Sequence, residues 1–268
     1  MSAPDPAAFP VAGAPPVTTR LIPSRFPPVP AFEDAASPDD LDALFELEGW
    51  TNDRLSAPRL AQLSRDEWVF GRPNASVVMA AFLHGSPAGL RFSGPELGAW
   101  YASTAPATAV LEIANGLRAE IARSALPRIT QTCRRYAARL AGGYADVFGA
   151  APEFHDPDPA RYPVPQAFGR RVRDEGPELG LSGIRYESVR RPGHANWVCF
   201  RPPDVQDVIQ AEHLEIDVPE TGKVVVRVMD HSAGFRGAHV VSGGTGGLGL
   251  LTGRWLSQRG ARRLILVS

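Results

Sequence analysis

Apolar side chains recur at helical spacing in three regions of this chain. The first region begins near residue 103. Its apolar stripe is formed by Val110, Ala114, Leu117 and Ile121. Residues 128–148 and 166–176 show similar spacing, so all three regions are predicted to be helices. At a helical rotation of about 100° per residue, Glu112 points away from the stripe and faces either solvent or an open cleft.

Alternating apolar and polar positions predict strands nearer the C-terminus. Residues 184–189 alternate in this way, a turn follows at 191–194, and residues 196–200 return as a second strand. A hairpin of this kind brings Ser188 and Asn196 close together near its loop.

Other segments complete the prediction of a mixed α/β (α+β) fold. Residues 208–228 contain two more strand-like runs, and the apolar run 77–83 fits either a helix or a buried strand. Ser37, followed by Pro38 and two acidic residues, is typical of a helix start. Residues 1–19 are rich in proline and alanine and cannot bury much apolar surface, so we expect a disordered leader.

The composition narrows the class of protein. An apolar share of 44% suffices for a core, and a net charge of −1 gives no general electrostatic reason to bind nucleic acid or an anionic membrane. No apolar run approaches the ~20 residues that span a bilayer, and the N-terminus lacks a secretory pattern, so a cytoplasmic location is expected. Cys133 and Cys199 lack metal-ligand spacing, so no metal is expected.

Four polar residues have the chemistry needed to hold a dinucleotide and break its nicotinamide–ribose bond. They are Arg91, Tyr101, Glu112 and Ser188. The leaving group is already cationic, so this cleavage needs no general acid. A carboxylate on the ribose hydroxyls, a cation at the pyrophosphate and an orienting ring favour it instead. Each residue also has an ordinary interpretation, as a solvated acid, a surface cation, a core aromatic or a strand residue.

Several stretches resemble the RES-domain family, which is named after an Arg, a Glu and a Ser. They are R-L-I-P-S-R-F-P-P, M-A-A-F-L-H, R-F-S, W-Y-A-S, T-A-V-L-E and G-I-R-Y-E-S-V-R, in the family's order between about residues 20 and 228. The resemblance implies an ADP-ribosyltransferase-like fold with a split, mostly antiparallel sheet. It further implies a bacterial toxin that is neutralised by a cognate antitoxin protein.

The activity implied by the resemblance is destruction of NAD, by phosphorolysis to ADP-ribose-1″-phosphate and nicotinamide or by hydrolysis. NAD would be the substrate, inorganic phosphate a co-substrate, and no metal would be needed. The implied catalytic residues are Arg91, Glu112 and Ser188, and the implied NAD-binding residues are Arg20, Tyr101 and Asn196, with Arg25 as an alternative to Arg20.

Each of these residues has an implied role. Arg91 would bind the pyrophosphate or the incoming phosphate, Tyr101 would pack against the nicotinamide, and Glu112 would hold the ribose and stabilise its oxocarbenium-like state. Ser188 and Asn196 would contact phosphate or ribose. The chain departs from the family where I-A-N-G-L-R follows Glu112, and residues 32–76 are long enough for an inserted helix.

A second motif lies near the C-terminus. Residues 238–241 and 264–267 are predicted strands on either side of a Gly-rich turn and a helix, an incomplete βαβ Rossmann-like unit. This unit resembles the start of a polyketide synthase ketoreductase, a short-chain reductase. The catalytic Tyr and Lys of that family are absent, so we expect no hydride transfer. Gly243, Gly247 and Gly249 are weak candidates for a phosphate loop.

The predicted organisation is a leader at 1–19, a RES-like domain at 20–228, a linker at 229–237 and the βαβ fragment at 238–268. Three functional alternatives stay open. They are ADP-ribosylation of a protein target, an inactive binding module, and a ketoreductase fragment of NADP-dependent ancestry. The acceptor, and whether the protein forms a homo-oligomer, are left undecided by the sequence.

Overall fold

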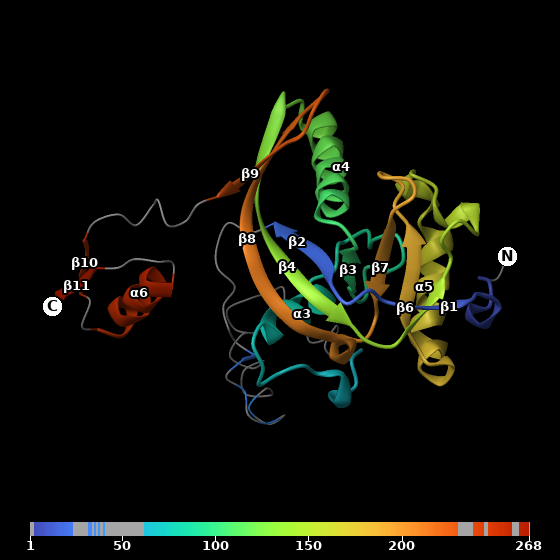
Figure 1. Cartoon of the computed structure of the whole chain (residues 1–268), viewed down its shortest axis with the longest axis horizontal. Helices are drawn as coiled ribbons and strands as arrows, with labels where there is room; N and C mark the ends of the chain where they lie inside the picture. The colour runs from blue at the N-terminus through green and yellow to red at the C-terminus, as the bar shows by residue number, and fades with distance from the viewer. Residues whose placement is uncertain are drawn as a thin grey trace.

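The computed structural model describes residues 3–23, 32–33, 35, 37, 40, 62–229, 238–243, 246–258 and 263–267 (Figure 1). Within this part, one large sheet has the strand order β1-β5-β6-β7-β3-β2-β4-β8-β9. Its strands are β1 Val11–Gly13, β2 Thr18–Pro23, β3 Trp100–Ser103, β4 Arg128–Leu140, β5 Gly143–Asp146, β6 Leu181–Glu187, β7 Ala195–Cys199, β8 Val205–Pro219 and β9 Val225–Met229. All neighbouring strands are antiparallel except β5 and β6. The predicted α+β fold with a mostly antiparallel sheet is confirmed.

Three helices pack on different parts of this sheet. They are α3 Ala75–Leu83, α4 Pro106–Ser124 and α5 Pro163–Glu175. In Figure 1, α4 lies beside the long curved strands β4 and β8, whereas α5 lies near β6. Helix α4 buries Ile121 in a cluster with Cys133 of β4 and Ile216 of β8, and α5 buries Phe168 against Ile184 of β6. The buried stripe of α4 follows the predicted helical spacing.

The sheet is split between β2 and β3. Strand β2 pairs with β4 along its whole length, from Thr18 to Pro23, but it meets β3 only at the pair Thr19 and Ser103. Beyond this pair the backbones diverge, and the guanidinium of Arg20 bridges the gap to two carbonyl oxygens of the β3 segment. The split therefore opens a space that side chains from both halves can line.

The prediction of a helix at 128–148 is wrong, because this segment forms strands β4 and β5. The apolar positions that suggest a helix include Ile129, Cys133, Tyr136 and Leu140, which recur every three or four residues. In the structure, β4 has register shifts between Arg134 and Tyr136 and between Ala137 and Arg139. The first irregularity separates the buried residues Cys133 and Tyr136 by three positions, which breaks the two-residue period of a strand and imitates the spacing of a helix.

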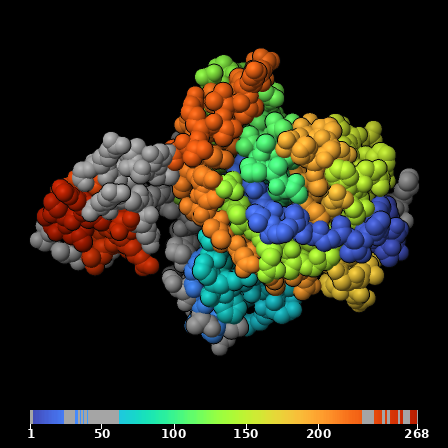
Figure 2. Space-filling model, viewed as in Figure 1, coloured from blue at the N-terminus to red at the C-terminus, as the bar shows by residue number. Residues whose placement is uncertain are grey.

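The predicted disordered leader is also wrong for residues 3–19. These residues run across the surface of the main body (Figure 2, blue) and include β1, which pairs with β5. Phe9 packs on Phe168 with ring centroids 5.2 Å apart, and Thr18 is fully buried. The composition of this segment does not reveal its ordered structure, because its backbone pairs with strands that are distant in sequence.

Several predicted elements are confirmed. The ambiguous run 77–83 belongs to α3, the segment 166–176 belongs largely to α5, and the hairpin of β6 and β7 exists. The Oγ of Ser37 accepts a hydrogen bond from Asp40 N, as at a helix start. Residues 41–61, which held the rest of that predicted helix, and Arg25 lie outside the described residues.

The C-terminal motif forms the predicted strand–helix–strand unit. Strand β10 (His239–Ser242) pairs in parallel with β11 (Leu264–Val267), and α6 (Gly247–Gln258) lies between them in sequence. Among the described residues, no helix has both the length and the hydrophobicity that crossing a membrane requires.

Candidate active site

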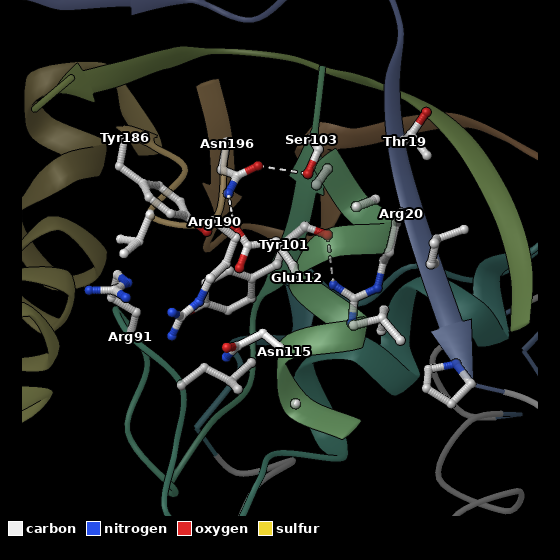
Figure 3. Close-up of a pocket in the computed structure, with 18 of the residues that line it drawn as sticks. Thr19, Arg20, Arg91, Tyr101, Ser103, Glu112, Asn115, Tyr186, Arg190 and Asn196 are labelled. Atoms are coloured by element: carbon white, nitrogen blue, oxygen red, sulfur yellow. Dashed lines mark hydrogen bonds between the residues drawn. The ribbon is translucent and has the colours of Figure 1, made fainter. Parts of the chain in front are cut away.

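A cleft of about 410 Å³ lies at the split between β2 and β3 (Figure 3). Side chains come from both halves of the sheet, from α4 and from the β6–β7 hairpin. Its charged and polar lining includes Arg20, Arg91, Tyr101, Ser103, Glu112, Asn115, Tyr162, Tyr186, Arg190 and Asn196. A volume of this size suits a ligand of the size of a nucleotide.

Glu112 is held by a chain of hydrogen bonds at the back of the cleft. Its Oε1 accepts from Ser188 Oγ at 2.7 Å and from Asn196 Nδ2 at 2.9 Å. The amide of Asn196 is oriented in turn, because its Oδ1 accepts from Ser103 Oγ at 2.6 Å. Within the described part of the chain Oε2 of Glu112 has no hydrogen bond, so this oxygen is free for a ligand.

Ser188 lies behind Glu112 and does not line the cleft. Its side chain is fully buried. Besides donating to Glu112, Ser188 Oγ accepts from the backbone amides of Arg190 at 3.3 Å and Arg191 at 3.1 Å. The predicted contact of Ser188 with phosphate or ribose is therefore corrected: Ser188 positions Glu112 and fixes the turn that follows β6.

Arg20 is a cation without a carboxylate partner in the described residues. Its Nη1 donates to the carbonyl oxygens of Tyr101 at 3.1 Å and Ala99 at 3.4 Å, and its guanidinium stacks on Trp100. Burial lowers the pKa of Arg20 to about 10, and its buried Nε has no acceptor in the described part of the chain. An anionic ligand would supply what this guanidinium lacks.

Arg91 is fixed on another side of the cleft. Its Nη1 donates to the carbonyl oxygens of Phe154 at 2.9 Å and Asp156 at 2.7 Å, and its guanidinium stacks on Tyr162. The described residues provide no carboxylate for it. Neutral carbonyl partners hold the side chain in place and leave its positive charge available to the cleft.

The two tyrosines of the cleft wall differ in how their hydroxyls are used. Tyr101 Oη accepts from Phe92 N at 3.0 Å and pairs with Ser93 Oγ at 3.1 Å, which fixes the ring as a wall. Burial raises the pKa of Tyr101 to about 12. Burial and then the charge of Glu112 raise the pKa of Tyr186 well above its usual value, and its hydroxyl has no partner among the described residues.

Tyr186 and Arg190 were not predicted from the sequence. Tyr186 lies two residues before Ser188 in the alternating segment that predicts the strand, so this alternation could have revealed it. Arg190 belongs to the turn of the hairpin, and its guanidinium has no ion pair among the described residues. Among the described lining residues, Arg190, Arg20 and Arg91 are three cations and Glu112 is the single carboxylate, so these four side chains carry a net charge of +2.

Five of the seven residues considered for the RES-like site line this cleft together: Arg20, Arg91, Tyr101, Glu112 and Asn196. Gly243, Gly247 and Gly249 do not; they lie between β10 and the first turn of α6. Within the described residues, no group of three or more His, Cys, Asp or Glu side chains is arranged to hold a metal ion.

The fold and the cleft define an α+β protein whose described residues place three arginines around one carboxylate. A profile of the RES domain matches residues 68–219, more than half of the chain, and the chain belongs to this family. A profile of the KR domain matches residues 237–268. The chain is 29% identical over 197 residues to the uncharacterized protein y4oC of Sinorhizobium fredii, covering 72% of this chain and 79% of that protein. Membership of the RES family supports an NAD-related function of the toxin–antitoxin type.

Proposed function

We propose that this protein binds NAD in the cleft and breaks the bond between nicotinamide and ribose. The observation that carries this proposal is the restrained carboxylate of Glu112. Among the described residues, its Oε2 accepts no hydrogen bond, and the cleft it lines has three arginines that lack a carboxylate partner. A dinucleotide brings a negatively charged pyrophosphate, and its ribose hydroxyls are the donors that a carboxylate oxygen accepts from.

The geometry supports a specific role for Glu112. As the glycosidic bond lengthens, positive charge develops on the ribose, and a nearby carboxylate stabilises that charge. The hydrogen bonds from Ser188 and Asn196 keep the carboxylate in place, so little reorganisation is needed during the reaction. Glu112 Oε2 would accept from a ribose hydroxyl, and Tyr101 would form the wall beside the nicotinamide.

Arg20 is the cation best suited to the pyrophosphate. Its side chain is partly buried, and two carbonyl oxygens fix its orientation while the buried Nε remains without an acceptor among the described residues. A pyrophosphate oxygen in this position would satisfy the guanidinium and anchor the non-reacting part of the substrate.

The test is analysis of the products of NAD after incubation with purified protein, with and without inorganic phosphate. Wild-type protein should release nicotinamide, and Glu112→Gln should be slower by about 100-fold or more, because an amide cannot supply the negative charge. Glu120→Gln is a matched control, since Glu120 is exposed on the same helix. Intact NAD after prolonged incubation with wild-type protein would contradict the proposal.

The same assay separates the alternative acceptors. Free ADP-ribose or its phosphate ester in solution would be the product of the proposed enzyme, whereas ADP-ribose attached to protein would indicate a protein target.

Family membership supports a toxin held inactive by a cognate antitoxin. We therefore expect that growth arrest in a cell depends on Glu112, and that an antitoxin prevents it by covering the cleft.

A further inference from the structure

The hydroxyl of Tyr186 has no hydrogen-bond partner among the described residues, although the side chain is only 7% exposed. Its ring lines the cleft and packs on Phe92, with ring centroids 4.9 Å apart. Tyr101 differs, because its hydroxyl is bound to Phe92 N and Ser93 Oγ. Polar groups this deeply buried normally have a partner, so a buried cleft hydroxyl that lacks one is a binding group for a ligand.

The hydroxyl of Tyr186 keeps its proton at neutral pH. Burial, followed by the negative charge of Glu112, raises the pKa of Tyr186 well above its usual value, and the opposing effect of Arg91 is smaller. A protonated phenol donates a hydrogen bond, so the ligand atom that meets it is an acceptor.

The position of Tyr186 indicates which part of the dinucleotide it meets. Tyr186 and Arg20 lie on opposite sides of Glu112 in Figure 3. With the pyrophosphate at Arg20 and the ribose at Glu112, the nicotinamide extends along the wall formed by Tyr101 toward Tyr186. The polar substituent of that ring is its 3-carboxamide, whose oxygen accepts hydrogen bonds.

We infer that the hydroxyl of Tyr186 donates a hydrogen bond to the carboxamide oxygen of nicotinamide, and that it thereby selects substrates by their leaving group. This inference rests on the proposed function and assigns the leaving-group side of the same site. The substrate class is a dinucleotide whose pyridinium ring carries a carbonyl group at position 3. Tyr101 contributes the face of its ring, because its hydroxyl is already bound.

This hydrogen bond stabilises the transition state more than the ground state. In NAD the ring is a cation and withdraws electrons from the carboxamide. As the bond between ribose C1″ and the ring nitrogen breaks, its electron pair goes to that nitrogen, the nicotinamide becomes neutral, and its carbonyl oxygen becomes a better acceptor. An interaction that strengthens in this way raises kcat. An oxygen of water or phosphate forms the new bond to C1″, and water then releases a proton to the solvent.

The experiment compares three substrates in wild-type protein and in Tyr186→Phe. They are NAD, its 3-acetylpyridine analogue, which keeps the carbonyl oxygen, and its thionicotinamide analogue, whose sulfur is a weaker acceptor. The kcat/KM for release of the pyridine product should fall by about 10-fold for NAD and for the acetylpyridine analogue. For the thionicotinamide analogue it should fall by less than about threefold. Each substrate is compared with itself, so differences in leaving-group reactivity cancel.

Tyr144→Phe is the matched control. Tyr144 is fully buried outside the lining of the cleft, and its hydroxyl donates to Ala141 O at 3.0 Å. Tyr144→Phe should lower the midpoint of urea unfolding and leave all three kcat/KM values unchanged. Tyr186→Phe should do the reverse, because its hydroxyl has no partner among the described residues to lose.

The outcomes separate this inference from the proposed function. Equal losses on all three substrates would overturn it, because the hydroxyl would then bind a part that the substrates share, such as the ribose. An unchanged kcat/KM for NAD in Tyr186→Phe would also overturn it, and in both cases nicotinamide release by wild-type protein leaves the proposed function standing. If wild-type protein releases a pyridine product from none of the three, both proposals fail.

Discussion

Two regions of this chain carry features of nucleotide-binding proteins, and they differ in what surrounds those features. In the cleft, side chains from β2, β3, α4 and the β6–β7 hairpin meet around Glu112. In the C-terminal unit, a glycine-rich turn precedes α6, and the adjoining strands leave Val240 and Ile265 about half exposed or more. The first region combines several chain segments into one site, whereas the second offers a local backbone motif.

A nucleotide-binding motif depends on the side chains that surround it. A glycine-rich turn lets a phosphate approach the first turn of a helix, but it supplies no group that reacts. The cleft supplies cations, a restrained carboxylate and an aromatic wall. We therefore expect that substitutions in the cleft change catalysis strongly and that substitutions in the C-terminal unit do not.

Arg20 should give the largest effect among the cleft substitutions beyond Glu112. Arg20→Ala removes the cation and leaves the carbonyls of Ala99 and Tyr101 unpaired, so we expect the KM for NAD to rise by about 100-fold and stability to fall by about 2 kcal/mol. Steady-state kinetics and urea unfolding measure the two effects. Arg20→Lys keeps the positive charge but loses the paired N–H donors of the guanidinium, so it should recover only part of the affinity for NAD. An unchanged KM for NAD in Arg20→Ala would show that Arg20 does not bind NAD.

Ser188→Ala should have the next largest effect. It removes one donor to Glu112 and the acceptor of two backbone amides, so kcat should fall by about 10- to 100-fold while the KM for NAD changes little. The free energy of unfolding should fall by about 1 to 3 kcal/mol. Ser124→Ala, at the exposed end of α4, is the control. A rise in KM without a fall in kcat would indicate that Ser188 touches the substrate after all.

The sequence predicted most of the residues that line the cleft, but not the position of Ser188. The motif order grouped Arg20, Arg91, Tyr101, Glu112 and Asn196 into one site, and all five line the cleft. It also grouped Ser188 with them, but the side chain of Ser188 lies behind Glu112, because the sequence does not show which neighbour the hydroxyl of a residue beside a turn will meet. That Ser188 lies behind Glu112 depends on the packing of α4 against the hairpin, which connects segments 76 residues apart.

The fold shows the same limit. Local signals predicted α5, whose apolar spacing is that of a helix, and the β6–β7 hairpin, whose strands are joined by a short turn. They failed for β4, which pairs with the distant strands β2 and β8 and contains register shifts. They also failed for the N-terminal segment, because β1 pairs with β5 over a distance of more than one hundred residues. In both segments, pairing with strands distant in sequence determined the secondary structure, because the local preference of the residues for one structure was weak.

A smaller effect is expected from pH. His155 Nε2 accepts from Glu187 N, and burial lowers the pKa of His155, with the charge of Arg91 a further cause. The folded protein therefore favours neutral His155, and this stability is present above the unfolded pKa of about 6.5. It is lost as pH falls below that value toward the lower pKa of the folded state. Thermal unfolding at several pH values should show this loss in wild-type protein and less of it in His155→Gln.

A matched pair of glycine substitutions gives the last and smallest comparison. Gly116 lines the cleft within α4 and has open space where a Cβ would lie, so Gly116→Ala should raise stability by about 0.5 to 1 kcal/mol. Gly243 has a φ of +70°, so Gly243→Ala strains the turn after β10 by about 1 kcal/mol. Because no described residue of that turn lines the cleft, nicotinamide release by Gly243→Ala should stay within about twofold of wild type. A larger loss of activity would mean that the C-terminal unit acts on the cleft, and the contrast between the two regions would have to be abandoned.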